Sequence, residues 1–231
     1  VEDELFNLRL AQDIARVLET RFPRVECRAY GRETMEELKA RKKRGEKLVV
    51  FNLVENVSRK GEWQYKAAEA LEKAGIPFTG CGSAAMRLDA SKQGMKIAFV
   101  QHDLPTAAWF TPEWLEKGGR IPGPCIVKSA TYHGSCGLTA DSVSDDPATL
   151  LRLIRTNQDL HGGAWYAEQY IHGREFYLGM IGRAGEDPEF LPLGEVIFHG
   201  NAFKDQPHIL SYDAKWQENG IGFTHGACPG S

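Results

Sequence analysis

One almost continuous apolar run constrains the fold of this chain more than any other feature. Residues 48–53 read Leu-Val-Val-Phe-Asn-Leu, without the alternation of polar and apolar residues that a half-exposed strand shows. Such a run predicts a strand of a parallel sheet that is covered on both faces. Helices are predicted at residues 2–21 and 63–74, and a short strand at residues 76–78. This alternation of helices and strands predicts a layered α/β domain.

The composition excludes several classes of function. The chain has 231 residues, of which 42% are hydrophobic and 26% charged, as is ordinary for a globular protein. The formal net charge of -3 gives no reason to expect nucleic acid or an anionic membrane as a partner. No apolar run is long enough to span a bilayer. The five cysteines are scattered and form no Cys-x-x-Cys pair, which favours reduced thiols, a cytoplasmic location and no zinc site.

A second apolar run ends in a lysine and leads into a loop that contains glycine. Residues 125–127 predict a buried strand that ends at Lys128, and residues 138–143 predict the returning strand of a hairpin. The loop between them contains Gly134 and Ser135, and glycine lets backbone N–H groups approach an anion closely. The hairpin is therefore a candidate lid over phosphates. A solvated lysine beside an ordinary turn is the alternative interpretation, and the P-loop pattern is absent because no Gly-Lys-Ser/Thr follows.

Local signals predict the remaining elements. Thr34 and Glu37 form the pattern of a capping box at the start of a helix. Residues 84–102 predict one continuous helix, which carries Lys92 and Lys96 one turn apart. Helix starts are predicted at Thr111-Pro112 and Asp146-Pro147, strands at 25–29, 107–110, 165–171, 175–181 and 191–198, and a loop at 212–216.

These features follow one another in the order of a known family. The landmarks are Val50-Phe51-Asn52-Leu53, Gly75-Ile76-Pro77-Phe78-Thr79-Gly80, Lys92 with Lys96, Leu104-Pro105, Ile126-Val127-Lys128, Gly134-Ser135, Ala167-Glu168-Gln169-Tyr170-Ile171, Gly173-Arg174-Glu175-Phe176, Tyr212-Asp213-Ala214-Lys215 and Cys228-Pro229. Each landmark is weak alone, whereas the ordered set with its spacings is specific. On this basis the chain resembles the ATP-grasp ligases, most closely the D-alanine–D-alanine ligase-like branch.

The resemblance implies an α/β protein with the ATP-grasp fold. Residues 1–88 would form an N-terminal α/β layered domain with a parallel sheet. Two α+β lobes would then clamp ATP. Residues 89–164 would form the small lobe and residues 165–231 the C-terminal lobe, which would be incomplete.

The resemblance also implies which residues meet the phosphates of ATP. Lys92 would lie over the α-phosphate, and Lys128 over the α- and β-phosphates. The loop with Gly134 and Ser135 would close over the β- and γ-phosphates, and Lys215 would reach the γ-phosphate. Ser135 and Lys215 would thus take part in catalysis. Lysine ammonium groups are suitable point charges for phosphate oxygens.

A second group of residues is implied to meet the nucleoside. Glu168 would accept a hydrogen bond from the adenine amino group, and the backbone of Gln169, Tyr170 and Ile171 would line the purine edge. Glu175 would hold the ribose hydroxyls. A surface ion pair is the alternative interpretation of Glu175.

The chain departs from the family pattern at three places. The family's magnesium ligands and an oxyanion-stabilising arginine lie on a C-terminal segment, which is expected beyond Ser231. The family's N-terminal histidine-glycine motif with its glutamate has no counterpart between Val1 and Asn56, which leaves the amino-acid substrates open. Cys136 stands where the family has a second serine, and Trp216 where it has a tyrosine.

The implied activity is that of an ATP-dependent carboxylate–amine ligase that forms a peptide bond. ATP would phosphorylate a carboxylate, and an amine would attack the resulting acyl phosphate, with magnesium as a cofactor. The partners would be small molecules, namely ATP, an amino acid or other carboxylate, and an amine, and a homodimer is one option for the assembly. Two alternatives are open: a nucleotide-binding protein of the same fold without ligase activity and, less favoured, a small-molecule kinase.

Overall fold

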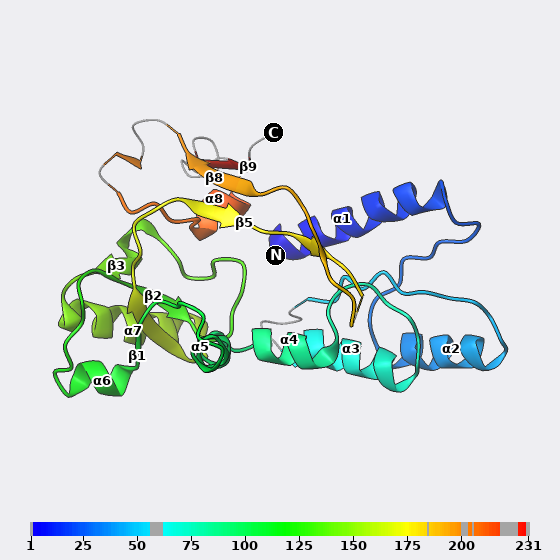
Figure 1. Cartoon of the computed structure of the whole chain (residues 1–231), viewed down its shortest axis with the longest axis horizontal. Coiled ribbons are helices and arrows are strands. Elements are labelled where there is room, and N and C mark those ends of the chain that lie inside the picture. Colours follow the sequence, from blue (N-terminus) through cyan, green and yellow to red (C-terminus); the bar gives the residue numbers. More distant parts are fainter. Residues whose placement is uncertain are drawn as a thin grey trace. The chain divides into compact units, whose positions relative to one another are not determined.

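The chain divides into two compact units, and each has a buried core of its own. The computed structural model describes residues 2–55, 62–183, 185–199, 203–204, 206–217 and 226–229 (Figure 1). Unit 1 is Val1–Leu104 and unit 2 is Pro105–Ser231. The three-part division predicted from the sequence stays a prediction.

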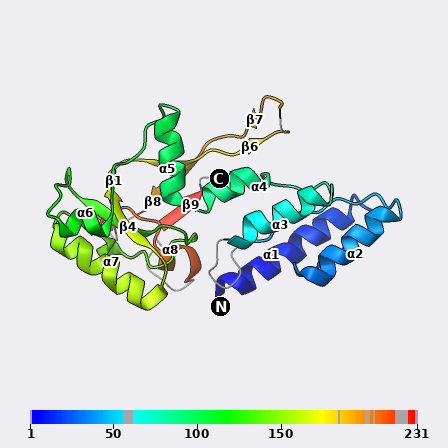
Figure 2. The ribbon, with the colours of Figure 1, turned by 90° about the horizontal axis from the view of Figure 1, so that it is seen from below.

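Unit 1 is mainly helical among its described residues. The helices are α1 (Glu2–Glu19), α2 (Arg32–Lys43), α3 (Glu62–Lys73), α4 (Ser83–Asp89) and α5 (Lys92–Gln101). Helices α3 and α4 are neighbours in the unit (Figure 2). Met35, Leu71 and Ile76 form the buried core. Helix α3 ends close to its predicted end, because Gly75 follows in the left-handed region, with a φ of 60°.

A single parallel bridge takes the place of the strand predicted at residues 48–53. Val50 pairs with Phe78, with bonds from Val50 N–H to the Pro77 carbonyl (2.8 Å) and from Thr79 N–H to the Val50 carbonyl (3.0 Å). Val50 packs against the core, whereas Val49 and Phe51 are 59% and 45% exposed. The prediction of burial on both faces is therefore wrong for the described residues. Residues 25–29, also predicted as a strand, form none.

Two local predictions in unit 1 are wrong, and in each case a hydrogen bond of a polar side chain gives the reason. Helix α2 begins after Gly31, and the Thr34 hydroxyl donates to the Ala29 carbonyl (2.7 Å), so the predicted capping box does not form. The helix predicted at 84–102 is interrupted between α4 and α5. Ser91 caps α5 there, because its hydroxyl accepts a hydrogen bond from the Gly94 N–H group at 3.0 Å.

Unit 2 contains a four-stranded antiparallel sheet. Its order is β1 (Trp109–Phe110), β4 (Trp165–Gln169), β2 (Cys125–Ser129) and β3 (Val143–Ser144). The antiparallel pairing of β2 with β3 confirms the predicted hairpin. The returning strand predicted at residues 138–143 is wrong except at Val143, because Ala140–Ser142 form a 3-10 turn that Thr139 and Ser142 cap reciprocally.

Helices α6 (Pro112–Glu116) and α7 (Pro147–His161) accompany this sheet (Figures 1 and 2). Both predicted caps are confirmed: the Thr111 side chain accepts from Trp114 N–H, and Asp146 accepts from Ala148 and Thr149 N–H. The helices and one face of the sheet enclose the core of unit 2, which consists of Leu115, Cys125, Val127, Leu150, Ile154, Trp165 and Ala167. The register of β2 with β4 determines which side chains are neighbours on the opposite face of the sheet. It places Lys128 opposite Tyr166 and Ile126 opposite Glu168.

The rest of unit 2 forms smaller sheets and one short helix. Strands β5 (Glu175–Tyr177), β8 (Gly194–Phe198) and β9 (Gly226–Pro229) form one sheet, and β6 (Met180–Ile181) pairs with β7 (Glu189–Phe190). Helix α8 (Tyr212–Trp216) forms where a loop was predicted, and it follows Ser211, whose hydroxyl bonds to Asp213. Within the part of the chain that is described, no helix has the length and apolar character needed to traverse a membrane.

Candidate functional site

Lys128 and Glu168 meet on the sheet face opposite the core of unit 2. The Lys128 ammonium donates to Glu168 Oε1 at 2.6 Å, although 40 residues separate the two in sequence. They meet because β2 and β4 are neighbours, and Lys128 lies diagonally across from Glu168 in the ladder. Burying an unpaired carboxylate would be costly, so the ammonium offsets the cost of burying Glu168, which is 8% exposed.

Tyr166 contributes a second donor to the same carboxylate. Its hydroxyl donates to Glu168 Oε2 at 3.0 Å. Tyr166 lies two residues before Glu168 on β4, so both side chains point to the same face. Burial, together with the charge of Glu168, raises the pKa of the Tyr166 phenol far above its usual range. The phenol therefore keeps its proton and remains a donor.

The glycine loop, residues 134–137, turns through left-handed backbone conformations. The φ angles of Gly134, Ser135 and Gly137 are 67°, 61° and 69°. Glycine is required at position 137, since a Cβ there would lie 2.5 Å from the Trp165 ring. The conformation of Ser135 is uncommon for a residue with a side chain, which marks the loop as a segment held by its surroundings.

Those surroundings are the segment that contains α8. Trp216 Nε1 donates to the Gly134 carbonyl at 2.8 Å, and the Ser135 hydroxyl donates to the Leu210 carbonyl. The Tyr212 N–H group donates to the Leu138 carbonyl at 3.1 Å. The loop with Ser135 and the helix with Lys215, predicted separately as catalytic, are thus joined.

Lys215 and Glu175 influence each other electrostatically. Burial lowers the pKa of the Lys215 ammonium, and the charge of Glu175 acts in the opposite direction. Glu175 begins β5 and is exposed, whereas Lys215 is half-buried on α8. Glu175 also raises the pKa values of Tyr170 and Tyr177, for which burial is the main cause. Glu175 therefore lies close enough to Lys215, Tyr170 and Tyr177 to affect their ionisation.

The residues predicted to line a purine edge follow directly from β4. The Gln169 N–H group donates to the Ala108 carbonyl at 2.8 Å, and the Tyr170 N–H group to the Pro124 carbonyl at 2.9 Å. Both N–H groups therefore hold the sheet together. Ile171 is 66% exposed.

Lys92 is the one predicted site residue that belongs to unit 1, where it is the first residue of α5. Its role at the α-phosphate stays a prediction. Lys96, one turn further along α5, is buried.

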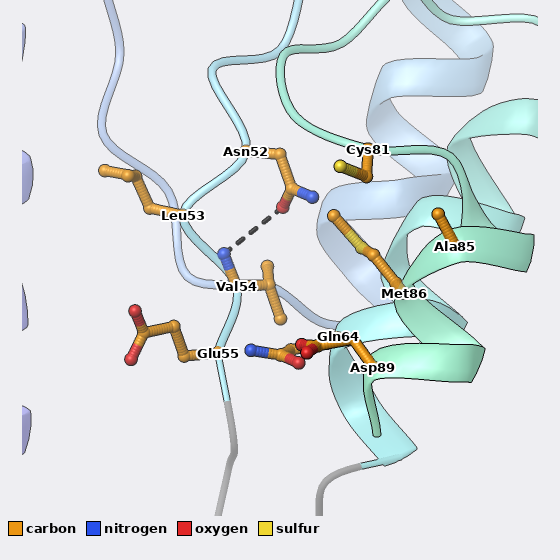
Figure 3. A pocket seen from close by; sticks show the side chains of 9 residues that line it. All are labelled: Asn52, Leu53, Val54, Glu55, Gln64, Cys81, Ala85, Met86 and Asp89. Atoms are coloured by element: carbon orange, nitrogen blue, oxygen red, sulfur yellow. Dashed lines mark hydrogen bonds between the residues drawn. The ribbon is translucent and has the colours of Figure 1, made fainter. Parts of the chain in front are cut away.

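Unit 1 also contains an open cavity of about 290 Å³. It is lined by Asn52, Leu53, Val54, Glu55, Gln64, Cys81, Ala85, Met86 and Asp89 (Figure 3). Asn52 turns its side chain back, and its Oδ1 accepts from Val54 N–H at 3.2 Å. None of the predicted site residues lines this cavity. Across the described residues, no group of three or more His, Cys, Asp or Glu could hold a metal ion.

Sequence reasoning missed two residues of the site. Tyr166 could have been found from its position, because it precedes Glu168 by two residues on a strand. Trp216 was noted only as a departure from a family pattern, and its contact spans 82 residues of sequence, for which no local signal exists.

The fold is that of known enzymes. D-alanyl-alanine synthetase A from Vibrio cholerae superposes with a TM-score of 0.53 and 22% identity, over 67% of this chain and 47% of that chain. The biotin carboxylase domain of the Hydrogenobacter thermophilus 2-oxoglutarate carboxylase, in complex with MgADP, ADP and bicarbonate, gives a TM-score of 0.51 and 15% identity, over 70% of this chain and 37% of that chain. The protein therefore has the ATP-grasp fold, as the sequence predicted.

Sequence comparison shows which ATP-grasp proteins the chain resembles. A D-alanine–D-alanine ligase from Ralstonia nicotianae is 35% identical over 152 residues, which cover 64% of this chain and 44% of the relative. The chain thus spans about half the length of the curated relatives it matches. No protein-family model matches. The chain is thus similar in sequence to D-alanine–D-alanine ligases over 64% of its length and has the ATP-grasp fold, in agreement with the resemblance inferred from the ordered landmarks.

Proposed function

We propose that this chain binds ATP on the sheet face of Lys128 and Glu168, as part of an ATP-dependent carboxylate–amine ligase. The observation that supports this most is the 2.6 Å contact between Lys128 and Glu168. The contact brings together on one sheet face an ammonium group, which attracts phosphates, and a carboxylate, which accepts from an amino group. To meet the phosphates while Glu168 meets the base, the Lys128 ammonium would swing away from Glu168. The name of the Ralstonia relative supports the formation of a C–N bond.

The proposed phosphate contacts come from lysines and the glycine loop. Lys128 meets the α- and β-phosphates, and Lys92 the α-phosphate. Gly134 and Ser135 close over the β- and γ-phosphates, where left-handed backbone conformations can turn N–H groups toward an anion. Lys215 reaches the γ-phosphate. It shares its electrostatic surroundings with Glu175, which favours the charged ammonium against the effect of burial.

The proposed nucleoside contacts come from β4 and the start of β5. Glu168 accepts from the adenine amino group, and Glu175 from the ribose hydroxyls. Gln169, Tyr170 and Ile171 line the purine edge. Because the N–H groups of Gln169 and Tyr170 bond within the protein, these two residues would offer carbonyl groups or side chains to the base.

The proposed reaction joins a carboxylate to an amine through an acyl phosphate. The γ-phosphoryl group passes to the carboxylate with release of ADP, and the amine then displaces phosphate. Both the carboxylate and the γ-phosphate are anionic, and the ammonium groups of Lys128 and Lys215 would offset their repulsion. Magnesium would supply further charge neutralisation. The described residues contain no ligand set for it, so the proposal places none there. The substrates, a homodimer and a cytoplasmic location stay predictions.

Titration calorimetry with ATP tests this proposal. We expect Lys128→Ala to weaken ATP binding by about tenfold to a hundredfold, because hydrogen bonds to charged groups contribute about 1.5–3 kcal/mol. Lys43→Ala is the matched control, since Lys43 lies in the last turn of α2, outside the proposed site. Equal affinities of the two variants would contradict the site.

Phosphate release separates the ligase from its alternative. The protein in its full length is incubated with ATP, magnesium and a panel of amino acids. Release that depends on an amino acid supports the ligase, whereas ATP binding without any release favours the nucleotide-binding protein.

A further inference from the structure

Tyr166 makes a contact that none of the proposed roles uses. Its hydroxyl bonds to Glu168 Oε2 at 3.0 Å, while the Lys128 ammonium bonds to Oε1 at 2.6 Å. The Tyr166 side chain is among the most buried of the described residues, with 1% exposed. A hydroxyl buried so deeply needs a hydrogen-bond partner inside the protein, and here that partner is a carboxylate at the centre of the proposed site.

The sheet fixes the geometry of this group of three side chains. Tyr166 and Glu168 share β4, and Lys128 on β2 lies directly opposite Tyr166. One donor therefore reaches each carboxylate oxygen, from two backbone positions that the ladder holds in place. A carboxylate bonded at both oxygens loses freedom to rotate. The three residues act as one unit: a lysine, a tyrosine and the glutamate that both orient.

The chemistry of these donors defines what Glu168 can recognise. An ionised carboxylate only accepts hydrogen bonds, and the phenol, which burial keeps protonated, donates to it. A nucleobase that meets Glu168 must therefore present a donor. Adenine has a 6-amino group, which donates. A base with a 6-oxo group would instead bring lone pairs toward a negative charge, which is repulsive.

We propose that Tyr166 is a positioning residue that holds Glu168 as a fixed acceptor and thereby selects an amino-bearing base over an oxo-bearing base. This inference rests on the proposed function, namely nucleotide binding at Glu168. Without the hydroxyl, Glu168 Oε2 loses the donor that Tyr166 supplies, and the carboxylate can turn toward other partners. Base selectivity then falls even where phosphate binding through Lys128 persists.

Titration of the chain with ATP and with inosine triphosphate tests this inference, since inosine has a 6-oxo group where adenine has the amino group. We expect the wild type to prefer ATP by at least about tenfold. In Tyr166→Phe, which removes only the hydroxyl, we expect the ATP-to-inosine-triphosphate preference to fall by about three- to tenfold, the size of one hydrogen bond. Tyr65→Phe serves as the control, because Tyr65 lies on α3 and packs its ring against Arg87.

The possible results separate this inference from the proposed function. Wild-type chain that binds neither triphosphate would refute nucleotide binding, and the inference with it. Wild type that prefers ATP, with the same preference in Tyr166→Phe, would overturn the inference alone. Equal weakening of both triphosphates in Tyr166→Phe would also overturn it, because a merely structural role affects the two ligands alike.

A double-mutant cycle keeps the inference testable if Tyr166→Phe fails to fold. Glu168→Gln replaces the buried carboxylate with a neutral amide. In that background, Tyr166→Phe does not leave a buried negative charge without its hydrogen-bond donor. If Tyr166 acts only through Glu168, the Glu168→Gln variant and the double variant have the same preference between the two triphosphates. A further change in preference in the double variant would show that Tyr166 acts independently of Glu168, which would overturn the inference.

Discussion

Gly137 closes the glycine loop against the core of unit 2. Its φ of 69° lies in the left-handed region, and a Cβ there would lie 2.5 Å from the Trp165 ring and 2.8 Å from Asn157 Oδ1. Trp165 is fully buried and cannot move aside. We therefore expect Gly137→Ala to lower the free energy of unfolding by about 2–4 kcal/mol, from backbone strain and overpacking together. Chemical denaturation measures this loss.

Gly118 provides a matched control for this prediction at the residue scale. Its φ of 72° is nearly the same, but a Cβ at Gly118 would meet no atom within 4 Å. Gly118→Ala should therefore cost only the backbone strain, about 1–2 kcal/mol. If the two variants lose equal stability, the close packing of Gly137 against Trp165 has no energetic consequence.

At the scale of elements, Glu72 links α3 to α4. Its two carboxylate oxygens accept hydrogen bonds from the hydroxyl and from the N–H group of Ser83, the first residue of α4. The hydroxyl bond, and then the backbone bond, lower the pKa of Glu72 from its usual 4.5. A lowered pKa in the folded state means that this stabilisation is fully present above pH 4.5 and is lost as the pH falls through the folded-state pKa.

Glu72→Gln should therefore lower the Tm at neutral pH, and the difference from the wild type should shrink in acid. Thermal unfolding followed from pH 7 down to pH 3 measures this, with Glu186→Gln in an exposed turn as the control. A Tm difference that is constant over the whole range would show that the charge of Glu72 does not matter for the link.

The same scale shows why some elements could be predicted and others could not. The starts of α6 and α7 were predicted correctly, because Thr111 and Asp146 cap helices through contacts two or three residues away. The strand at 48–53 was not, because burial of its second face depends on distant residues, and Val49 is exposed. In the site, Lys128 and Glu168 could be named from the sequence, because their charges suit phosphate and amino groups. Tyr166 was missed although its place two residues before Glu168 on a predicted strand indicated it, whereas the contact of Trp216 with Gly134 spans 82 residues and has no local signal.

At the scale of the whole molecule, Lys92 and Glu168 are proposed to meet two different parts of ATP. Lys92 belongs to unit 1, and Lys128 and Glu168 belong to unit 2. The proposal assigns Lys92 to a phosphate and Glu168 to the base, so ligands that lack one of these parts distinguish the two roles. Adenosine has the base and no phosphate, so its affinity should not depend on Lys92.

We expect Lys92→Ala to weaken ATP binding by about tenfold or more, as loss of a bond to a charged group predicts, and to leave adenosine binding unchanged. Glu168→Gln should weaken binding of both ligands, because both contain the adenine amino group. Competition against a fluorescent ATP analogue measures all four affinities. If Lys92→Ala weakens adenosine and ATP equally, Lys92 supports the fold of unit 1 and does not bind phosphate. If it weakens neither, the nucleotide is held by unit 2 without Lys92.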